Sequence, residues 1–340
     1  MFPQLKDRLL RKATIIAARN RRIRNFIEKK RISLDFPSNL FIEPTNRCNL
    51  RCKMCPQNDE DFMERGFMDF QTFRKVIDES VNYGKRTAIF FHKDGEPLLH
   101  EGLFEMIEYA VSKKAAYRTH LSTNAHLLSE DKIKRLILSG LDSVIVNIDA
   151  NYEETYRAIK GRGGLSKVES NVKEMIKFRN SIGKINPAIR VKIIPVDENR
   201  NEIEDFKNKW KHIADEVVIS KEFSWPGRKG KNGKKNEFLR YRYPCISLWL
   251  SMTINWDGTV SVCCIDYYHK GIIGNVKDDT IERIWKGKLL QEIRKKHING
   301  NFSEIEVCRN CQGLWIRDTV GKNSEKWLIR KMKKAGLWNE

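Results

Sequence analysis

Three cysteines lie within eight residues, Cys48, Cys52 and Cys55, at the spacing C-x3-C-x2-C. They follow an apolar run, Leu40 to Ile42, and a turn signal at Pro44, so we expect them on a loop directly after a strand. A tight loop of this kind can direct three thiolates toward one point. Soft sulfur ligands favour zinc or an iron-sulfur cluster. Structural zinc usually takes four ligands, whereas a four-iron cluster held by three cysteines keeps one iron open for another molecule.

This spacing resembles the signature of the radical SAM enzymes, whose open iron binds the amino and carboxylate groups of S-adenosylmethionine. The resemblance implies a 4Fe-4S cluster on Cys48, Cys52 and Cys55. It also implies reductive cleavage of S-adenosylmethionine to a 5'-deoxyadenosyl radical, with a flavodoxin or ferredoxin-type protein as the electron donor. One position departs from the family pattern, because Met54 stands where an aromatic residue is usual. We interpret this as the exchange of one apolar side chain for another.

The length and composition fit a globular protein. The chain has 340 residues, of which 40% are hydrophobic, enough for one domain of about 200 residues and a smaller one. No apolar run reaches the roughly 18 to 20 residues that span a bilayer, and the basic N-terminus lacks the apolar segment of a signal peptide. We therefore expect a cytoplasmic protein, in which the eight cysteines serve metal binding rather than disulfides.

The net charge of +20 is concentrated in three segments. Residues 1–36, 221–242 and 317–340 carry +8, +6 and +4, which leaves the rest of the chain nearly neutral. Residues 5–31 repeat apolar side chains at roughly helical spacing, which predicts a basic amphipathic helix. We rank docking of this helix on the protein first and contact with an anionic membrane surface second. We do not expect a nucleic-acid partner, because the body of the chain is not basic.

Between these segments, short apolar strands alternate with helical stretches. We expect strands at 40–43, 87–91, 117–122, 143–147, 188–194 and 216–219, and helices at 69–83, 103–113, 129–139, 166–182 and 202–210. This rhythm predicts an α/β fold built of βα units around a parallel sheet. By the radical SAM resemblance, residues 37–220 form a partial (βα)6 barrel. Active-site loops then follow the carboxyl ends of the strands, as the cysteine loop does.

The loop after the second strand contains the sequence Asp94-Gly95-Glu96-Pro97. It resembles the Gly-Gly-Glu-Pro segment of radical SAM enzymes, with Asp94 in the place of the first glycine. In that family the segment meets the amino group of S-adenosylmethionine. The resemblance therefore implies that Gly95 and Glu96 bind the cofactor, with the Glu96 carboxylate as the partner of the ammonium group.

The third and fourth strands end in short polar segments at 122–124 and 147–149. The resemblance implies that their polar side chains contact the methionine and ribose parts of the cofactor; they are Ser122, Asn124, Asn147 and Asp149. Short polar side chains at strand ends also cap helices, and that alternative stays open. Arg190, within the fifth strand, either reaches inward toward a carboxylate or lies at the surface.

The other five cysteines fall between residues 245 and 311, after the basic, glycine-containing linker at 221–242. Cys245 and Cys263 flank a predicted hairpin, 249–254 and 259–262, whose turn at 255–258 contains Asn, Asp and Gly. The pair Cys308 and Cys311 follows a predicted helix at 280–296. Four thiolates from three places suit structural zinc as well as a fully ligated 4Fe-4S cluster.

Behind a radical SAM barrel, this group resembles the SPASM domains of the same superfamily. The common features are the Cys-x12-Gly-x4-Cys start, the 274–276 turn, the helix at Ile284 and Trp285, and the Cys-x2-Cys end. Residues 243–316 lack the further cysteines of a full SPASM domain. They resemble the shortened twitch form with one auxiliary 4Fe-4S cluster, as in the aminocyclitol dehydrogenase of butirosin biosynthesis. The implied ligands are Cys245, Cys263, Cys308 and Cys311.

The resemblance implies an oxidoreductase that dehydrogenates a small sugar, polyol or aminocyclitol. The adenosyl radical would remove hydrogen from a carbinol carbon, a base would take the hydroxyl proton, and the auxiliary cluster would accept the remaining electron. Related dehydrogenases point to Arg228, ahead of the first auxiliary cysteine, for the proton step. Arginine is a poor base unless its pKa is strongly perturbed. The alternative, that Arg228 is only a solvated residue of the linker, is therefore at least as well supported.

Three other enzyme functions stay open, together with a non-catalytic metal-binding adaptor. A radical epimerase would use Cys264 as a hydrogen donor, although Cys264 could also turn into the core. A peptide maturase would usually carry a leader-binding domain of about 80 residues, whereas 36 residues precede the predicted barrel. An RNA-modifying enzyme would account for the charge and would bind its substrate in a salt-sensitive way.

Overall fold

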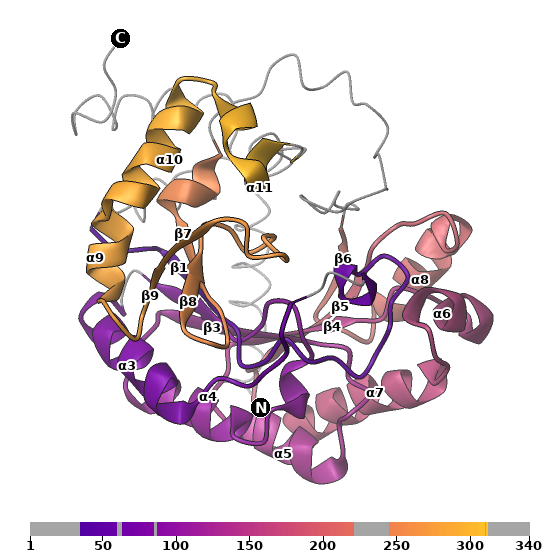
Figure 1. Cartoon of the computed structure of the whole chain (residues 1–340). Coiled ribbons are helices and arrows are strands. Elements are labelled where there is room, and N and C mark those ends of the chain that lie inside the picture. Colours follow the sequence, from indigo (N-terminus) through magenta and orange to yellow (C-terminus); the bar gives the residue numbers. More distant parts are fainter. Residues whose placement is uncertain (1–34, 60–62, 85–86, 221–244, 310, 312–340) are drawn as a thin grey trace, which may run out of the picture. The chain divides into compact units, whose positions relative to one another are not determined.

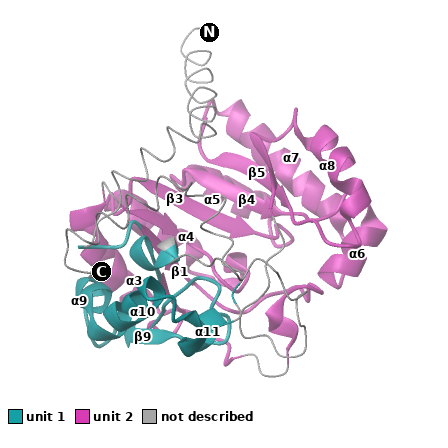
Figure 2. Ribbon diagram, turned by 90° about the horizontal axis from the view of Figure 1, so that it is seen from above, with its two compact units in different colours: residues 1–38, 223–252, 260–340 teal, residues 39–222, 253–259 magenta. Residues whose placement is uncertain are grey.

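The computed structural model describes residues 35–59, 63–84, 87–220, 245–309 and 311. Residues 1–34 of the predicted N-terminal helix, the linker at 221–242 with Arg228, and the C-terminal segment 317–340 lie outside the described residues. The chain divides into two compact units (Figure 2). Unit 2 contains residues 39–222 and 253–259, and unit 1 contains the rest.

Unit 2 is built on six parallel strands that lie side by side in sequence order. They are β1 (Asn39–Ile42), β2 (Ala88–Phe90), β3 (Arg118–Thr123), β4 (Ser143–Asn147), β5 (Ala188–Ile193) and β6 (Glu216–Ile219). All six predicted strands are present, with ends within two residues of their predicted positions. The predicted α/β fold with a parallel sheet is therefore confirmed.

Helices connect successive strands of unit 2. They are α3 (Phe70–Ser80), α4 (Leu103–Ser112), α5 (Glu130–Leu138), α6 (Glu153–Lys160), α7 (Leu165–Ser181) and α8 (Ile203–Trp210). Helices α3, α4, α5 and α7 line one face of the sheet (Figure 1). Sequence reasoning missed α6, because the helix has only eight residues and only two buried apolar side chains, those of Tyr156 and Ile159, too few for a helical pattern to stand out.

Alternation along the strands separates the two faces of this sheet. On β5 the side chains of Ile189, Val191 and Ile193 are buried on the side where α7 packs, and those of Arg190 and Lys192 point to the opposite face. Helix starts follow the same local logic, since the Asp69 side chain accepts a hydrogen bond from the Thr72 amide at the start of α3, 2.7 Å, and so caps an otherwise unsatisfied donor.

Unit 1 holds the second group of cysteines. Its described elements are η6 (Ile246–Trp249), the first half of β7 (Ser251–Ile254), most of β8 (Thr259–Ser261), β9 (Ile272–Asn275), α9 (Ile281–Lys286), α10 (Lys288–Ile298), η7 (Phe302–Glu304) and α11 (Glu306–Arg309). The hairpin prediction is confirmed by β7 and β8. The single helix predicted at 280–296 is wrong, because the backbone is extended at Gly287, ψ 153°, and splits it into α9 and α10. No helix among the described residues is long and apolar enough to cross a membrane.

A buried ion pair ties the edge of the sheet in unit 2 to α7. Arg179, at the end of α7, pairs with Asp215, and the side chains are only 6% and 18% exposed. Asp215 also accepts a hydrogen bond from the Ile189 amide of β5, 2.7 Å. The Asp215 carboxylate, at the start of β6, therefore connects this strand to β5 and to α7.

We expect Asp215→Ala to lower the free energy of unfolding by about 3 to 5 kcal/mol, because it leaves the Arg179 guanidinium buried without its counter-charge. The matched control is Asp197→Ala, since Asp197 pairs with Arg200 but is 94% exposed. We expect that control to change stability by less than about 0.5 kcal/mol. Urea unfolding of both variants measures the difference, and equal losses would contradict a structural role for the buried pair.

Candidate functional site

The cysteine loop and the loop after β2 touch through their backbones. The Glu96 amide donates a hydrogen bond to the Arg47 carbonyl, 2.8 Å. At Gly95, an added Cβ would lie 2.5 Å from the Arg47 carbonyl oxygen and nearer still to that of Thr45, so no side chain fits there. Gly95 is thus a residue that lets two loops approach each other, which is the physical reason for glycine at this position.

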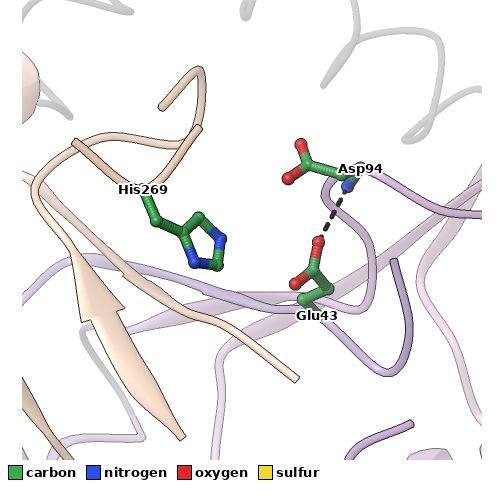
Figure 3. A group of neighbouring side chains, drawn as sticks. All are labelled: Glu43, Asp94 and His269. Atoms are coloured by element: carbon green, nitrogen blue, oxygen red, sulfur yellow. Dashed lines mark hydrogen bonds between the residues drawn. The ribbon is translucent and has the colours of Figure 1, made fainter. Parts of the chain in front are cut away.

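Asp94 stands where the Gly-Gly-Glu-Pro pattern of the family has its first glycine, and its negative charge is compensated. Its carboxylate pairs with the Lys93 ammonium, 2.6 Å, and the two side chains are 1% and 0% exposed. Its amide donates to the Glu43 carboxylate, 3.2 Å, as Figure 3 shows. The other oxygen of Glu43 accepts from the Trp256 amide, 3.2 Å. Glu43, itself fully buried, therefore joins the end of β1 to two further turns of unit 2.

The Glu96 side chain is buried, 2% exposed, and is fully engaged by hydrogen bonds. It accepts from the Thr123 hydroxyl at 2.6 Å, from the Asn124 amide at 2.7 Å and from the Leu98 amide at 3.2 Å. Burial raises the pKa of the Glu96 carboxyl, and these three hydrogen bonds oppose the rise. A cation placed beside Glu96 would favour the carboxylate form. Sequence reasoning missed Thr123, which stands between two predicted site residues.

The predicted cofactor residues fall into two groups within unit 2. Asn124 contacts Glu96 through its amide and the cysteine loop through its side chain, which donates to the Asn49 side chain at 2.8 Å. Asn147 donates to the Ser122 hydroxyl at 2.8 Å. The structure therefore brings Gly95, Glu96 and Asn124 to the cysteine loop and sets Ser122 beside Asn147.

Asp149 lies in a buried ion pair rather than at a helix cap. Its carboxylate accepts from the Lys160 ammonium, 2.5 Å, and from the Ile194 amide, 2.8 Å. Lys160 also donates to the Asn147 carbonyl, 2.9 Å. The side chains of Lys160 and Asp149 are each 4% exposed. The backbone of Asp149 is left-handed, φ 63°, a conformation that non-glycine residues adopt mainly where surrounding contacts hold them.

Helix α6 holds the cysteine loop from the other side. The amides of Arg51 and Lys53 donate to the carbonyls of Lys160, 3.3 Å, and Ile159, 2.8 Å. The charge of Lys160 lowers the pKa of Cys52 although burial raises it overall. The loop is therefore fixed by α6 on one side and by the Glu96 segment on the other, and Lys160 places a positive charge near its central thiol.

The three thiols of the loop are close enough to influence each other's ionisation. Burial raises the pKa of Cys48 to about 11 and that of Cys55 to about 12, and the negative charges of neighbouring cysteines add to the rise. None of the eight cysteines, all of which the structure describes, forms a disulfide. Three soft donors on one short loop fit a cluster that keeps one iron open. Because bound iron requires thiolates, cluster assembly here must release protons.

The second cysteine group converges within unit 1. Burial, together with the charges of Cys263 and Cys311, raises the pKa of Cys245 to about 12, so these thiols lie near one another. The Cys308 thiol is 9% exposed. The Cys263 thiol has a raised pKa because of a hydrogen bond with Cys264 and because of burial. Cys264 is half-buried and lies against the thiol of Cys263; the choice of Cys263 as the ligand stays a prediction.

His297, at the end of α10, joins this group although no spacing in the sequence pointed to it. The Cys245 amide donates to His297 Nδ1, 3.2 Å, so the ring proton sits on Nε2, which lies 3.3 Å from Cys308 Sγ. The ring therefore donates a hydrogen bond to one sulfur and orients the backbone of another. It is 1% exposed and meets Phe302 edge-on, centroids 4.9 Å apart.

Comparison with protein families identifies both cysteine regions. Residues 42–188 match the radical SAM superfamily, and residues 245–312 match the SPASM domain, described as an iron-sulfur cluster-binding domain. S-adenosylmethionine and iron-sulfur clusters are the cofactors of these domains, and the cysteine sets described above fit the clusters. The zinc alternative is not supported by these matches.

Individual relatives agree with this assignment. Over 165 residues, the chain is 31% identical to the tungsten-containing aldehyde ferredoxin oxidoreductase cofactor-modifying protein of Pyrococcus furiosus. The aligned part makes up 48% of this chain and 45% of that protein. The chain thus spans less than half the length of this relative. The chain is also 20% identical to the S-adenosyl-L-methionine-dependent 2-deoxy-scyllo-inosamine dehydrogenase of Niallia circulans. In this case the aligned part makes up 81% of this chain and 93% of the dehydrogenase. The crystal structure of BtrN in complex with AdoMet and 2-DOIA has a similar fold, TM-score 0.56 at 18% identity, over 81% of this chain and 92% of that one.

Gly161 ends α6 in the left-handed conformation, φ 74°, and an added Cβ would lie 2.7 Å from the Arg51 carbonyl oxygen. We expect Gly161→Ala to destabilise the protein by more than the about 1 to 2 kcal/mol that left-handed alanine costs, and to reduce iron uptake at the cysteine loop. Urea unfolding and iron analysis after anaerobic reconstitution measure the two effects.

The matched control is Gly300→Ala, because Gly300 has nearly the same φ, 78°, but nothing within 4 Å of an added Cβ. We expect it to show the conformational cost alone and to bind iron normally. If both variants lose the same stability and the same iron, the contact between α6 and the cysteine loop does not position the loop.

Proposed function

Since the chain carries a radical SAM domain followed by a SPASM domain, we propose that it cleaves S-adenosylmethionine reductively and dehydrogenates a small sugar, polyol or aminocyclitol. The observation that carries this proposal is the match to a dehydrogenase along 93% of its length and 81% of this chain. Other relatives match a smaller share of the chain, such as the cofactor-modifying protein, whose match covers 48% of it.

The residues of unit 2 would bind and orient the cofactor. Cys48, Cys52 and Cys55 hold the open cluster, and the buried Glu96 carboxylate receives the ammonium group of the methionine part. Glu96 cannot turn away from this position, because hydrogen bonds from Thr123 and from the Asn124 amide, 2.6 and 2.7 Å, fix both its oxygens. When bound, S-adenosylmethionine supplies the 5'-deoxyadenosyl radical that removes a substrate hydrogen, and the auxiliary cluster supplies an acceptor for the remaining electron.

The proton and electron steps need further groups. We keep Arg228, which lies outside the described residues, as the proposed residue of the proton step. Cys245, Cys263, Cys308 and Cys311 would hold the auxiliary cluster, with the His297 ring donating its Nε2 proton to the Cys308 sulfur. A flavodoxin or ferredoxin-type protein in the reducing cytoplasm would supply the electron that starts each turnover.

A radical epimerase is the second candidate function. It is favoured by one observation, the half-buried Cys264 thiol that lies beside a proposed cluster ligand. In that reaction Cys264 would return a hydrogen atom to the opposite face of the substrate carbon, and no ketone would form. Hydrogen from solvent would then enter the product, and Cys264→Ser would abolish turnover.

Anaerobic reconstitution tests the cofactor assignment. We expect about eight irons per chain, falling to about four when Cys48, Cys52 and Cys55 are replaced by alanine. Under reduction the wild-type protein should form 5'-deoxyadenosine, and the triple variant should form none. Incubation with polyols deuterated at carbon should transfer deuterium to 5'-deoxyadenosine and yield a ketone. Deoxyadenosine without a ketone from any polyol tested would reject the dehydrogenase and leave the radical cleavage intact.

We expect Glu96→Gln to weaken S-adenosylmethionine binding roughly 10- to 100-fold, because a neutral amide loses the charge-assisted hydrogen bond to the ammonium group. Equilibrium dialysis with reconstituted protein measures the affinity. The control is Glu204→Gln, which changes an exposed glutamate of α8 and should leave the affinity unchanged. Equal affinities of wild type and Glu96→Gln would remove the cofactor role of Glu96.

A further inference from the structure

The face of the sheet in unit 2 that points away from the helices carries a group of basic and aromatic side chains. Arg190 and Lys192 alternate with buried aliphatic residues on β5 and share this face. Lys192 pairs in register with Asn147 of β4, the residue that donates to Ser122. The two cations therefore stand in the same layer as residues already predicted to face the cofactor.

Two histidines extend this basic group across β2 and β3. The His120 ring stacks on Phe90, centroids 4.6 Å apart, and the His92 ring meets Phe90 edge-on at 5.9 Å. Burial lowers the pKa of both to about 3, and the positive charges of Arg190 at His120 and of Lys192 at His92 lower it further. Both rings are thus neutral near pH 7 and lie within electrostatic reach of the two cations.

The charges on this face do not balance. Arg190 is compensated by Glu216 of β6, 3.3 Å, and Asp149 is already engaged by Lys160, 2.5 Å. Among the described residues, no hydrogen-bond or ion-pair partner of the Lys192 ammonium is found. Burial lowers the pKa of Lys192, the charge of Asp149 opposes this, and the charge of Lys160 adds to it.

His92, which lies near Lys192, also has a side-chain atom without a hydrogen-bond partner in the described part of the chain. Its Nδ1 atom is buried and has no hydrogen-bond partner among the described residues. A buried polar atom without a partner is unfavourable, and a half-buried cation without an anion is unfavourable to a lesser degree. Perturbed groups of this kind cluster at functional sites, where a ligand can complete them.

We propose that Lys192, with Arg190 and His92 beside it, binds an anionic group of the substrate, a phosphate ester or a carboxylate. The proposal rests on the dehydrogenase function above and narrows its substrate to an acidic sugar or polyol. An anion at this place would form a charge-assisted hydrogen bond with the Lys192 ammonium and could accept or donate at His92 Nδ1. A protonated aminocyclitol would instead meet the positive charge of Lys192, which is unpaired among the described residues.

Binding of inorganic phosphate to the reconstituted full chain, saturated with S-adenosylmethionine, tests the site without turnover. We expect calorimetry to show phosphate binding that weakens roughly tenfold or more in Lys192→Met, and that persists in Lys192→Arg. The matched control is Lys207→Met, which removes an exposed lysine of α8 that pairs with Glu204 and should bind phosphate as the wild type does. Acetate in place of phosphate distinguishes the two anions: stronger binding of phosphate indicates a phosphate ester, and stronger binding of acetate a carboxylate.

Lys192→Met should fold, because it replaces a half-buried charge, unpaired within the described residues, by an apolar side chain of similar length, and its thermal midpoint should be equal to or above that of the wild type in the absence of phosphate. Failure of wild type to bind either anion, or equal binding by Lys192→Met, would overturn the site. Loss of S-adenosylmethionine affinity in Lys192→Met would also overturn it, because Lys192 would then serve the cofactor carboxylate. Formation of 5'-deoxyadenosine by the wild type is measured in parallel, so that failure of the proposed enzyme function is seen separately from failure of the anion site.

Discussion

The close backbone contact between the cysteine loop and the Gly95-Glu96 turn is the constraint on which the rest of the site depends. Only glycine fits at position 95, and the Glu96 amide reaches the Arg47 carbonyl directly, 2.8 Å. The carboxylate that would receive the cofactor is thereby fixed to the loop that would hold its iron. Ordered loops of this kind place reacting groups with little loss of entropy on binding.

Buried charges of unit 2 are mostly arranged in pairs, and the pairs have separate structural tasks. Lys93 compensates the charge of Asp94, which stands where the family pattern has a glycine. The pair of Lys160 and Asp149 connects α6 to the end of β4. The pair of Arg179 and Asp215 joins α7 to the edge of the sheet. Removing one partner of such a pair leaves the other uncompensated, which is more costly than the pair itself is stabilising. Lys192, half-buried on β5, differs from the lysine and arginine residues of these three pairs, because it has no such partner among the described residues.

Sequence patterns were sufficient for the elements whose signal is local. Short strand patterns of four to seven residues predicted β1 to β6, and the cysteine spacings predicted the two cluster regions that the family matches cover, residues 42–188 and 245–312. They failed at α6 and at Gly287. Helix α6 has eight residues, half of them charged, and its buried apolar side chains are those of Tyr156 and Ile159. A helix this short depends on tertiary contacts, which include its contact with the cysteine loop. At Gly287 the helical pattern of α9 continues into α10, and a single backbone torsion interrupts it.

The sequence by itself determined the parallel α/β sheet, the order of its loops and the two cysteine regions, because strand periodicity and short motifs are properties of neighbouring residues. Only the tertiary structure decided which polar residues meet. Thr123 at Glu96, Lys160 at Asp149 and His297 at Cys308 are contacts between residues 27, 11 and 11 positions apart, and Lys192 and His92 lie 100 positions apart. Such contacts follow from how strands and helices pack, which no local pattern specifies. The opening cysteines thus predicted the chemistry, and the packing around them supplied the residues that position it.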